Sequence, residues 1–261
     1  IYRKAFKKRD GVRYQSYLDS VKKGEKKINA TTLFPYEIVS KVTGYSSDET
    51  VDVLWDALPN YLEGNERNIL CVCDCSGSMS GTPMNVSISL GIYSAERNKG
   101  PFSGYFITYS DNPILQKVIG DTLTQKVRNL QSQNACSTNL QSVFEMVLSH
   151  AVKNKVKQSD MPEQVLIITD CEFNATQHGN TNLDAIKVKY KAAKYDMPQL
   201  VFWNVNSTQN NVPATANEKN VLLVSGSSPS VFKTLLSGKQ HTPVDQMIET
   251  LSQKIYDSVV V

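Results

Sequence analysis

Residues 68–79 of the chain read NILCVCDCSGSM, and this stretch decides how the rest of the sequence is organised. Its first half, Ile69 to Cys73, is a continuous apolar run of strand length, which is typical of a strand buried on both faces. Its second half is a polar turn in which Asp74, Ser76 and Ser78 alternate, with a glycine between the two serines. The stretch therefore predicts an internal strand that delivers one carboxylate and two hydroxyls to the edge of a sheet.

Apolar runs of similar length recur along the chain, and amphipathic helices lie between them. The runs occur at residues 105–109, 165–169, 200–205 and 221–224. The clearest helical pattern begins at Leu140 and keeps apolar residues at helical spacing through Ala151. This alternation predicts an α/β fold with a central, mostly parallel sheet flanked by helices. A tight polar turn between residues 105–111 and 113–119 predicts a hairpin and one antiparallel edge strand.

The first part of the chain has helical patterns and no strand-like run. One helix is expected over Val12–Lys23, a second over Tyr36–Val42 after Pro35, and a third after a capping box formed by Ser46 and Glu49. We therefore expect two domains. They are a helical segment over residues 1–62 and an α/β domain over residues 65–261, separated by a polar break.

Polar side chains gather where the strands of the α/β domain end. Ligands of open parallel sheets bind outside the carboxyl ends of the strands. The candidate ligands there are Asp74, Ser76, Ser78, Thr138 and Asp170. All five offer oxygen, which favours Mg²⁺ or Mn²⁺ over zinc. We expect the three hydroxyls to bind the ion directly and the two carboxylates to act through bound water. Thr138 also begins a capping box with Gln141, so helix capping is an alternative role for it.

These motifs resemble the metal-ion-dependent adhesion site of von Willebrand factor A (vWA) domains. D-x-S-x-S stands at residues 74–78, a Thr precedes the helix from Leu140, and Thr169-Asp170 ends a later strand. The resemblance covers residues 65–261 and implies a Rossmann-like fold, a bound Mg²⁺, and a protein ligand whose acidic residue completes the metal site. It does not imply catalysis.

The particular form of the motifs is similar to the intracellular branch of vWA domains, as in Ro ribonucleoproteins. Residues 26–30 (KKINA) and 35–39 (PYEIV) resemble the end of the TROVE-type helical module that precedes that domain. An uncharacterised family of plants, fungi and large DNA viruses has the same order of parts. The sequence departs from the family after Asp170, where family members often have glycine and this chain has Cys171, followed by Glu172. Glu172 adds a negative charge near the site, and its carboxylate could fill the open metal position.

The first 27 residues are strongly basic, with ten basic and three acidic residues and hence a net charge of +7 against +3 for the whole chain. A basic arm of this kind favours a polyanion partner, so RNA binding is the alternative function. The candidate contacts are Lys4, Lys7, Lys8, Arg9, Arg13, Lys22, Lys23, Lys26 and Lys27. A solvated helical face is the other interpretation of the same residues.

Five cysteines, an odd number, do not predict a disulfide framework. They are Cys71, Cys73, Cys75, Cys136 and Cys171. We interpret them as reduced thiols of an intracellular protein, and the C-x2-C spacing of zinc knuckles does not occur among them. No apolar run approaches the roughly 18 residues that would span a membrane, so no membrane partner is expected.

Enzymatic function is not expected from the motifs. A haloacid-dehalogenase phosphatase needs a second acid two residues after Asp74, where this chain has Ser76. The phosphate-binding loops G-x4-G-K-[ST] and G-x-G-x-x-G are missing from the sequence, and the histidine nearest to Ser76 along the chain is His150. We therefore expect a non-enzymatic binding module, with a hydrolase as the third possibility. Because Asp74 is assigned to a loop outside the core, we also expect Asp74→Ala to leave the fold intact.

Overall fold

The computed structural model describes residues 2–42, 48–63, 68–108, 113–131, 140–170, 182–206, 220–226, 247–248 and 251–252. The helical elements are α1 (Tyr2–Arg9), α2 (Gly11–Lys22), α3 (Pro35–Val39), α4 (Glu49–Asp56), α5 (Thr82–Arg97), α6 (Leu123–Gln131), α7 (Leu140–Asn154) and α8 (Asn182–Ala192), with short 3-10 turns η1 (Gly77–Met79) and η2 (Gln158–Asp160). The strands are β1 (Ile69–Cys73), β2 (Tyr105–Thr108), β3 (Leu115–Lys117), β4 (Gln164–Thr169), β5 (Gln199–Asn204) and β6 (Val221–Ser225).

The strands form one sheet in the order β3-β2-β1-β4-β5-β6. Strand β3 runs antiparallel to β2, and every other neighbouring pair is parallel. The predicted α/β class, the mostly parallel sheet and the edge hairpin are therefore confirmed. Strand β1 lies at the centre between β2 and β4, with Ile69 opposite Gln164 and Cys73 opposite Ile168.

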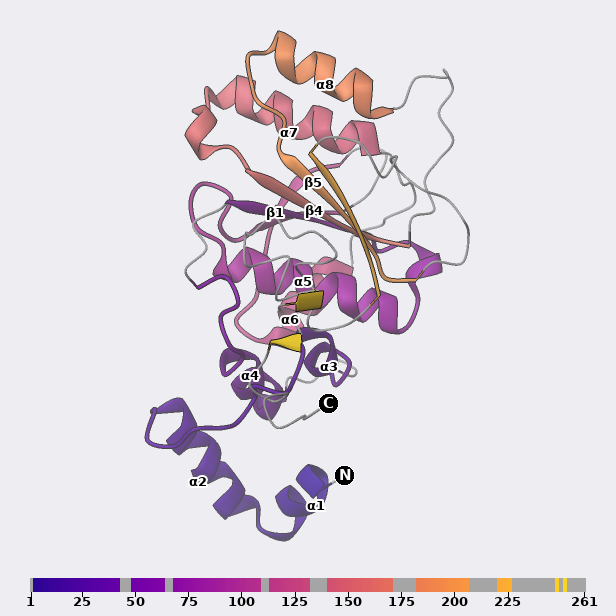
Figure 1. The fold of residues 1–261 in the computed structure, drawn as a ribbon. Helices are drawn as coiled ribbons and strands as arrows, with labels where there is room; N and C mark the ends of the chain where they lie inside the picture. The colour runs from indigo at the N-terminus through magenta and orange to yellow at the C-terminus, as the bar shows by residue number, and fades with distance from the viewer. Residues whose placement is uncertain are drawn as a thin grey trace.

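Two apolar cores lie on the two faces of this sheet. Cys71 and Cys73 of β1 belong to the core that includes apolar side chains of α5 and α6, whereas Leu70 and Val72 belong to the core that includes those of α7 and α8. All five residues of β1 are buried, as its unbroken apolar run predicted. Figure 1 shows the result as three layers, with α7 and α8 on one side of the sheet and α5 and α6 on the other.

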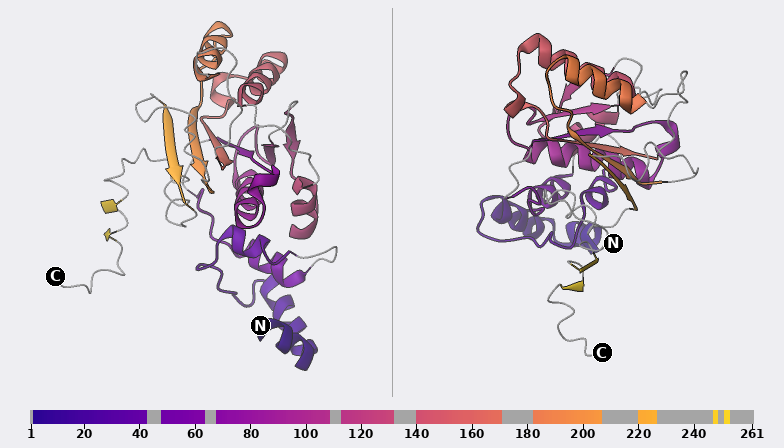
Figure 2. Two further views of the ribbon diagram at one scale, coloured as in Figure 1. Left: turned by 90° about the vertical axis from the view of Figure 1, so that its right-hand side faces the viewer. Right: turned by 45° about the horizontal axis from the view of Figure 1, so that its top comes forward.

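The helical segment packs onto the α5 side of the molecule. Ile38 of α3 and Trp55 of α4 are buried in the same core as α5, so this core is continuous from the sheet into the first part of the chain. Helix α2 attaches to α4 through a smaller cluster, in which the Tyr14 hydroxyl lies 2.7 Å from the Thr50 hydroxyl. Both views of Figure 2 place α1 and α2 at the end of the molecule away from α7 and α8.

The start of α4 differs from the sequence prediction. The helix begins at Glu49, and its N-cap is Asp48, whose carboxylate accepts a hydrogen bond from the backbone N–H of Thr50 at 3.0 Å. The predicted capping box led by Ser46 is therefore wrong, because Asp48 is a strong cap placed next to the helix. Within the described ranges, no helix is both long and apolar enough to cross a membrane.

The order of the strands creates a switch point beside β1. From β1 the chain passes through α5 to β2 on one side, and it later returns through α7 to β4 on the other side. In open α/β sheets such a point leaves a crevice at the carboxyl ends of the two central strands, where ligands bind. Asp74 follows β1 and Asp170 follows β4, so the fold brings both acids to the switch point.

Candidate functional site

Asp74 is the buried centre of the switch-point edge. Its side chain is fully buried, and its backbone N–H continues the β1–β4 ladder by donating to the carbonyl of Ile168 at 2.9 Å. One carboxylate oxygen accepts from the backbone N–H of Ser76 at 2.9 Å, and the other accepts from the Thr169 hydroxyl at 2.8 Å. The expectation that Asp74 lies outside the core is therefore wrong, because the residue extends the central strand by one position.

The electrostatics of Asp74 reflect this burial. Desolvation raises the pKa of its carboxyl, and the neighbouring charge of Asp170 raises it further, while the hydrogen bonds from Ser76 and Thr169 lower it. Asp170 itself is only 2% exposed. Two acids thus share a buried position at the ends of adjacent strands, which is an arrangement that a nearby cation stabilises.

The two serines of the turn follow Asp74 along the chain. Ser76 is half-buried and Ser78 is exposed, and their hydroxyl oxygens are 3.1 Å apart. Met79 of η1 is fully buried, and the turn enters α5 through Gly81 at φ +90°, a backbone conformation that glycine adopts at little cost. The hydroxyls are therefore held together at the surface, directly after the buried carboxylate.

Thr169 is the residue that sequence reasoning missed in this site. It was noted only as the partner of Asp170 in a motif, yet its hydroxyl fixes the orientation of the Asp74 carboxylate from the neighbouring strand. Its side chain is fully buried. The available signal was its place as the last residue of a buried strand, where a hydroxyl has to find a partner inside the protein.

The structure brings four of the five predicted metal ligands to one edge. Asp74, Ser76 and Ser78 follow β1, and Asp170 follows β4. Thr138 lies outside the described residues, as do Cys136, Cys171 and Glu172. The direct contribution of the Thr138 hydroxyl and the effect of the Glu172 charge therefore stay predictions.

The donors at this edge fit a hard divalent cation. Two carboxylates and two hydroxyls supply only oxygen, the ligand type that Mg²⁺ and Mn²⁺ prefer. Among the described residues, there is no group of three or more His, Cys, Asp or Glu side chains that could hold a metal ion. A site here would thus depend on neutral hydroxyls and water as much as on charge, and its affinity for Mg²⁺ would be weak.

The three cysteines around β1 are free thiols. Cys71 and Cys73 are buried in the core, and burial raises the pKa of Cys71 to about 12 and that of Cys73 well above its usual value. Cys75 stands between Asp74 and Ser76, and burial, followed by the Asp74 charge, raises its pKa to about 12. These thiols are therefore protonated at neutral pH, and Cys75 is not activated as a nucleophile.

The predicted nucleic-acid contacts divide into several groups. Arg9, Arg13 and Lys26 line one pocket of the helical segment. Lys22 forms an ion pair with Glu49, 2.6 Å from its carboxylate. The remaining candidates with described side chains are Lys7, Lys8, Lys23 and Lys27, which are exposed and do not line the pocket. Lys4 lies in α1, and its side chain is outside the described part of the structure.

Two family models match the chain. A family model described as a domain of unknown function (DUF7788) matches residues 68–258. A second model, also a domain of unknown function (DUF2828), matches residues 1–65. The uncharacterized protein L728 of Acanthamoeba polyphaga mimivirus is 31% identical over 255 residues, which is 95% of this chain and 45% of that protein. The chain thus spans about half the length of this curated relative.

Two solved structures were compared with the chain. The crystal structure of the Ro (RSR) protein of Deinococcus radiodurans matches 89% of this chain and 49% of its own, with a TM-score of 0.52 and 17% identity. The crystal structure of manganese-loaded Plasmodium vivax TRAP protein matches 62% of this chain and 69% of its own, with a TM-score of 0.39 and 14% identity. The Ro structure, which is matched along most of this chain, therefore shares its fold with it.

Proposed function

The chain belongs to the DUF7788 family, and from the geometry of its sheet edge we propose that its α/β body is a non-enzymatic binding module that uses a divalent cation. The cation is Mg²⁺ or Mn²⁺. Its partner is a protein or a ribonucleoprotein that presents an acidic group. The observation that carries the proposal is the burial of Asp74 and Asp170 at one switch point, next to the paired hydroxyls of Ser76 and Ser78.

The residues of the edge have separate roles in this proposal. Ser76, Ser78 and Thr138 offer neutral oxygens as direct ligands, and Asp74 and Asp170 accept hydrogen bonds from water on the ion. The bound cation supplies a positive charge that neutral ligands leave largely uncompensated, and this charge attracts a carboxylate of the partner. Thr169 and the backbone of Ser76 keep the Asp74 carboxylate in place, so the site needs little rearrangement when the ion binds.

Several features favour binding over catalysis at this edge. The high pKa of the Cys75 thiol disfavours a thiolate nucleophile. The hydroxyl of Ser76 is paired with that of Ser78, which is not a base. His150 lies on α7, and its ring centroid is 6.4 Å from that of Phe102. Phe102 does not belong to the sheet edge that holds Asp74. A hydrolase would need a base to activate a hydroxyl or water here.

An intracellular setting is part of the same proposal. The free thiols Cys71, Cys73 and Cys75 support it, because reduced cysteines are typical of proteins in a reducing compartment. The viral relative L728 is compatible with a protein that acts inside a host cell.

A titration with Mn²⁺ tests the metal site. We expect weak, saturable heat of binding by the wild type, and at least about a tenfold loss of affinity in Ser78→Ala, because a direct ligand is removed. Ser80→Ala is the matched control: Ser80 is also exposed, two residues further on, and its hydroxyl donates to the carbonyl of Gly77 at 2.8 Å. Equal Mn²⁺ affinity in Ser78→Ala and Ser80→Ala would show that the ion does not bind at these hydroxyls.

Acetate can then serve as a probe for the acidic group of the partner. We expect acetate to bind the Mn²⁺-loaded wild type and to show no binding to the metal-free protein, because only the cation attracts it to an edge that already holds two acids. Acetate binding that is independent of Mn²⁺ would contradict the proposed role of the ion, even if the ion itself binds.

A further inference from the structure

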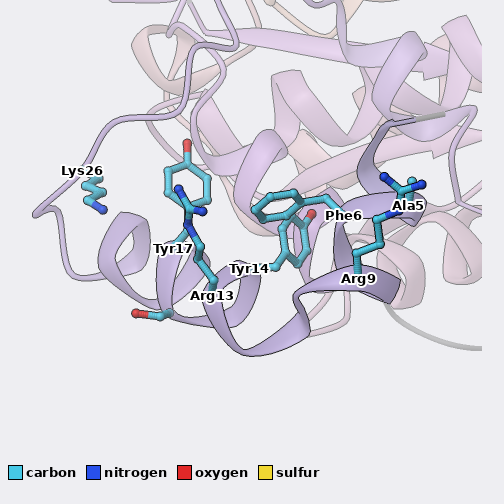
Figure 3. Close-up of a pocket in the computed structure, with 8 residues that line it drawn as sticks. Ala5, Phe6, Arg9, Arg13, Tyr14, Tyr17 and Lys26 are labelled. Carbon is cyan, nitrogen blue, oxygen red and sulfur yellow. The ribbon is translucent and has the colours of Figure 1, made fainter.

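A pocket of about 650 Å³ lies on the helical segment, formed by α1, α2 and the loop that follows α2. Its volume is within the range of about 300–1,000 Å³ that is usual for ligand sites. The lining residues are Ala5, Phe6, Arg9, Arg13, Tyr14, Ser16, Tyr17 and Lys26. In Figure 3 the side chains of Arg9 and Lys26 lie at opposite ends of this row, with the three rings between them.

The pocket contains three aromatic rings, and that of Phe6 is accessible to solvent. Phe6 is 41% exposed, and its ring meets that of Tyr14 edge to face with 5.8 Å between centroids. Tyr17 is half-buried beside them. Cations lie over two of the rings: the guanidinium of Arg13 is 6.0 Å from the Phe6 centroid, and the ammonium of Lys26 is 5.9 Å from that of Tyr17.

The charge of the pocket is positive and uncompensated. Three of the eight lining residues are cations and none is an acid. Within the part of the chain that the structure describes, Arg9, Arg13 and Lys26 form no ion pair with a carboxylate, whereas Lys22 of the same arm is paired with Glu49. Arg9, Arg13 and Lys26 are also exposed, so their charges are available to a ligand.

We propose that this pocket binds single-stranded nucleic acid. A base stacks on the ring of Tyr17, and Arg9, Arg13 and Lys26 contact the phosphates on either side of it. Alternating rings and cations are what a single strand requires, because every base has a π-face and every step of the backbone carries a charge. An acidic peptide would use the cations and leave the rings without a partner, and a duplex would keep its base faces hidden.

The proposal concerns α1 and α2 and is independent of the metal edge. Each phosphate neutralised on a single strand contributes a slope of roughly −0.7 to log K against log salt, so three cations give a slope of about −2. Binding is therefore strongest at low salt. Neither Mg²⁺ nor Ser78 is needed for it, which separates this proposal from the proposed function of the sheet edge.

Anisotropy of a labelled 12-nucleotide oligouridylate with the whole 261-residue chain, at about 50 mM salt, tests the role of the cations. We expect the double variant R9A/R13A to lose at least about tenfold in affinity, since both charges act inside the pocket. The matched control K8A/K23A removes the same charge from two exposed positions that do not line the pocket, one in α1 and one at the C-cap of α2. Equal losses in the two double variants would overturn the pocket and leave only a diffuse basic surface.

A second set of variants tests stacking. We expect Tyr17→Leu, which keeps an apolar side chain, to weaken binding about five- to tenfold, and Tyr17→Phe, which keeps the ring, to bind like the wild type. Thermal unfolding of both variants checks that the fold is retained. Wild-type affinity in Tyr17→Leu, equal affinity for a duplex, or displacement of the strand by polyglutamate of equal total charge would each overturn the stacking mode.

Discussion

Two clusters of arginine and aromatic side chains lie in the first hundred residues, and they differ in what surrounds the cation. In the pocket of α1 and α2, the exposed guanidinium of Arg13 lies 6.0 Å from the Phe6 ring. Between α4 and α5, the guanidinium of Arg97 lies 4.1 Å from the Tyr93 ring and 5.8 Å from the Trp55 ring, and its side chain is only 14% exposed.

The second cluster, which we call the Arg97 seam, comprises Trp55, Tyr93, Glu96, Arg97 and Lys126. Arg97 donates to the carbonyl of Trp55 at 3.2 Å, and the Trp55 indole N–H donates to Glu96 at 2.8 Å. Lys126 of α6 lies 2.6 Å from the other oxygen of Glu96. The seam thus joins α4, α5 and α6, and both of its cations pair with the one carboxylate of Glu96.

The same pair of an arginine and an aromatic ring therefore stabilises the fold at one position and is accessible to a ligand at the other, depending on its burial and on its other partners. In the seam the cation is desolvated and hydrogen-bonded, conditions under which a cation–π contact is worth about 2 kcal/mol, against roughly 0.5–1 kcal/mol at an exposed site. The seam therefore stabilises the packing of the helical segment, whereas the pocket contributes little to folding and leaves its charge to a ligand.

The largest expected effect is that of Arg97→Ala. Loss of the contact with Tyr93 and of the hydrogen bond to Trp55 should lower the free energy of unfolding by about 2–3 kcal/mol, which urea denaturation measures. Arg13→Ala is the matched control, with an expected loss of less than about 1 kcal/mol because the side chain is exposed. Equal losses would mean that burial does not distinguish the two clusters.

The next effect concerns Asp74, a buried charge without a cationic partner among the contacts described above. Asp74→Ala removes the acceptor for both Ser76 N–H and the Thr169 hydroxyl, so we expect a loss of about 1–3 kcal/mol. Asp74→Asn can accept from Ser76 and donate to Thr169, whose hydroxyl rotates, and should cost less. Thermal unfolding decides this, and Mg²⁺ should raise the Tm of the wild type but not that of Asp74→Asn. A larger loss in Asn than in Ala would contradict the assigned hydrogen bonds.

The sheet could be predicted because its strands are continuous apolar runs. Ile69–Cys73 became β1 residue for residue, and its alternating side chains divide between the two cores as a strand period of two requires. The position of Asp74 and Asp170 followed from the same logic, since both come directly after central strands. What the pattern could not show was that Asp74 extends the strand ladder and is fully buried.

The contacts between helices could not be predicted, because they join residues far apart along the chain. Arg97 and Trp55 are separated by 42 positions, and nothing in their local sequence links them. The pocket is a similar case. The charge of residues 1–27 was evident, but its concentration around Tyr17 depends on how α1 and α2 meet at Asp10, whose carboxylate caps α2. The start of α4 was misplaced because both Ser46 and Asp48 are good caps, and local preference does not choose between them.

A smaller effect is expected from Lys126→Met in the seam. The ion pair with Glu96 is lost, but Trp55 and Arg97 continue to compensate the Glu96 carboxylate. Because both partners are about one-fifth exposed, we expect a loss of roughly 1 kcal/mol in urea denaturation. Lys187→Met is the control, since its pair with Asp184 is 3.7 Å long and well exposed, and its loss should be close to zero. A larger effect at Lys187 would count against the seam as the stabilising unit.

The smallest effect is that of Glu49→Gln, which tests the ion pair between Lys22 of the basic arm and Glu49. The Glu49 carboxylate accepts from Lys22 at 2.6 Å and from Gln15 at 2.8 Å, and these hydrogen bonds lower its pKa. Because the pKa of Glu49 is lower in the folded state than in the unfolded state, its carboxylate stabilises the fold at pH values above the unfolded-state pKa. This stabilisation is lost as the pH falls through the folded-state pKa. Because the two side chains are 33% and 51% exposed, solvent screening limits the contribution to about 0.5 kcal/mol or less at neutral pH.

Urea denaturation of the wild type and Glu49→Gln between about pH 7 and pH 3 measures this contribution, because the range includes the usual pKa of a glutamate. We expect the wild type to be slightly more stable at neutral pH and the difference to vanish at the acidic end, where the carboxyl is protonated in both states. If the stability difference between the wild type and Glu49→Gln grew as the pH falls, the pKa of Glu49 would be raised by folding and not lowered. Oligouridylate binding should be unchanged in Glu49→Gln, since Lys22 does not line the pocket. A gain in binding would show instead that Glu49 competes with nucleic acid for the arm, and that the division between used and available charge is less sharp than the two arginine clusters suggest.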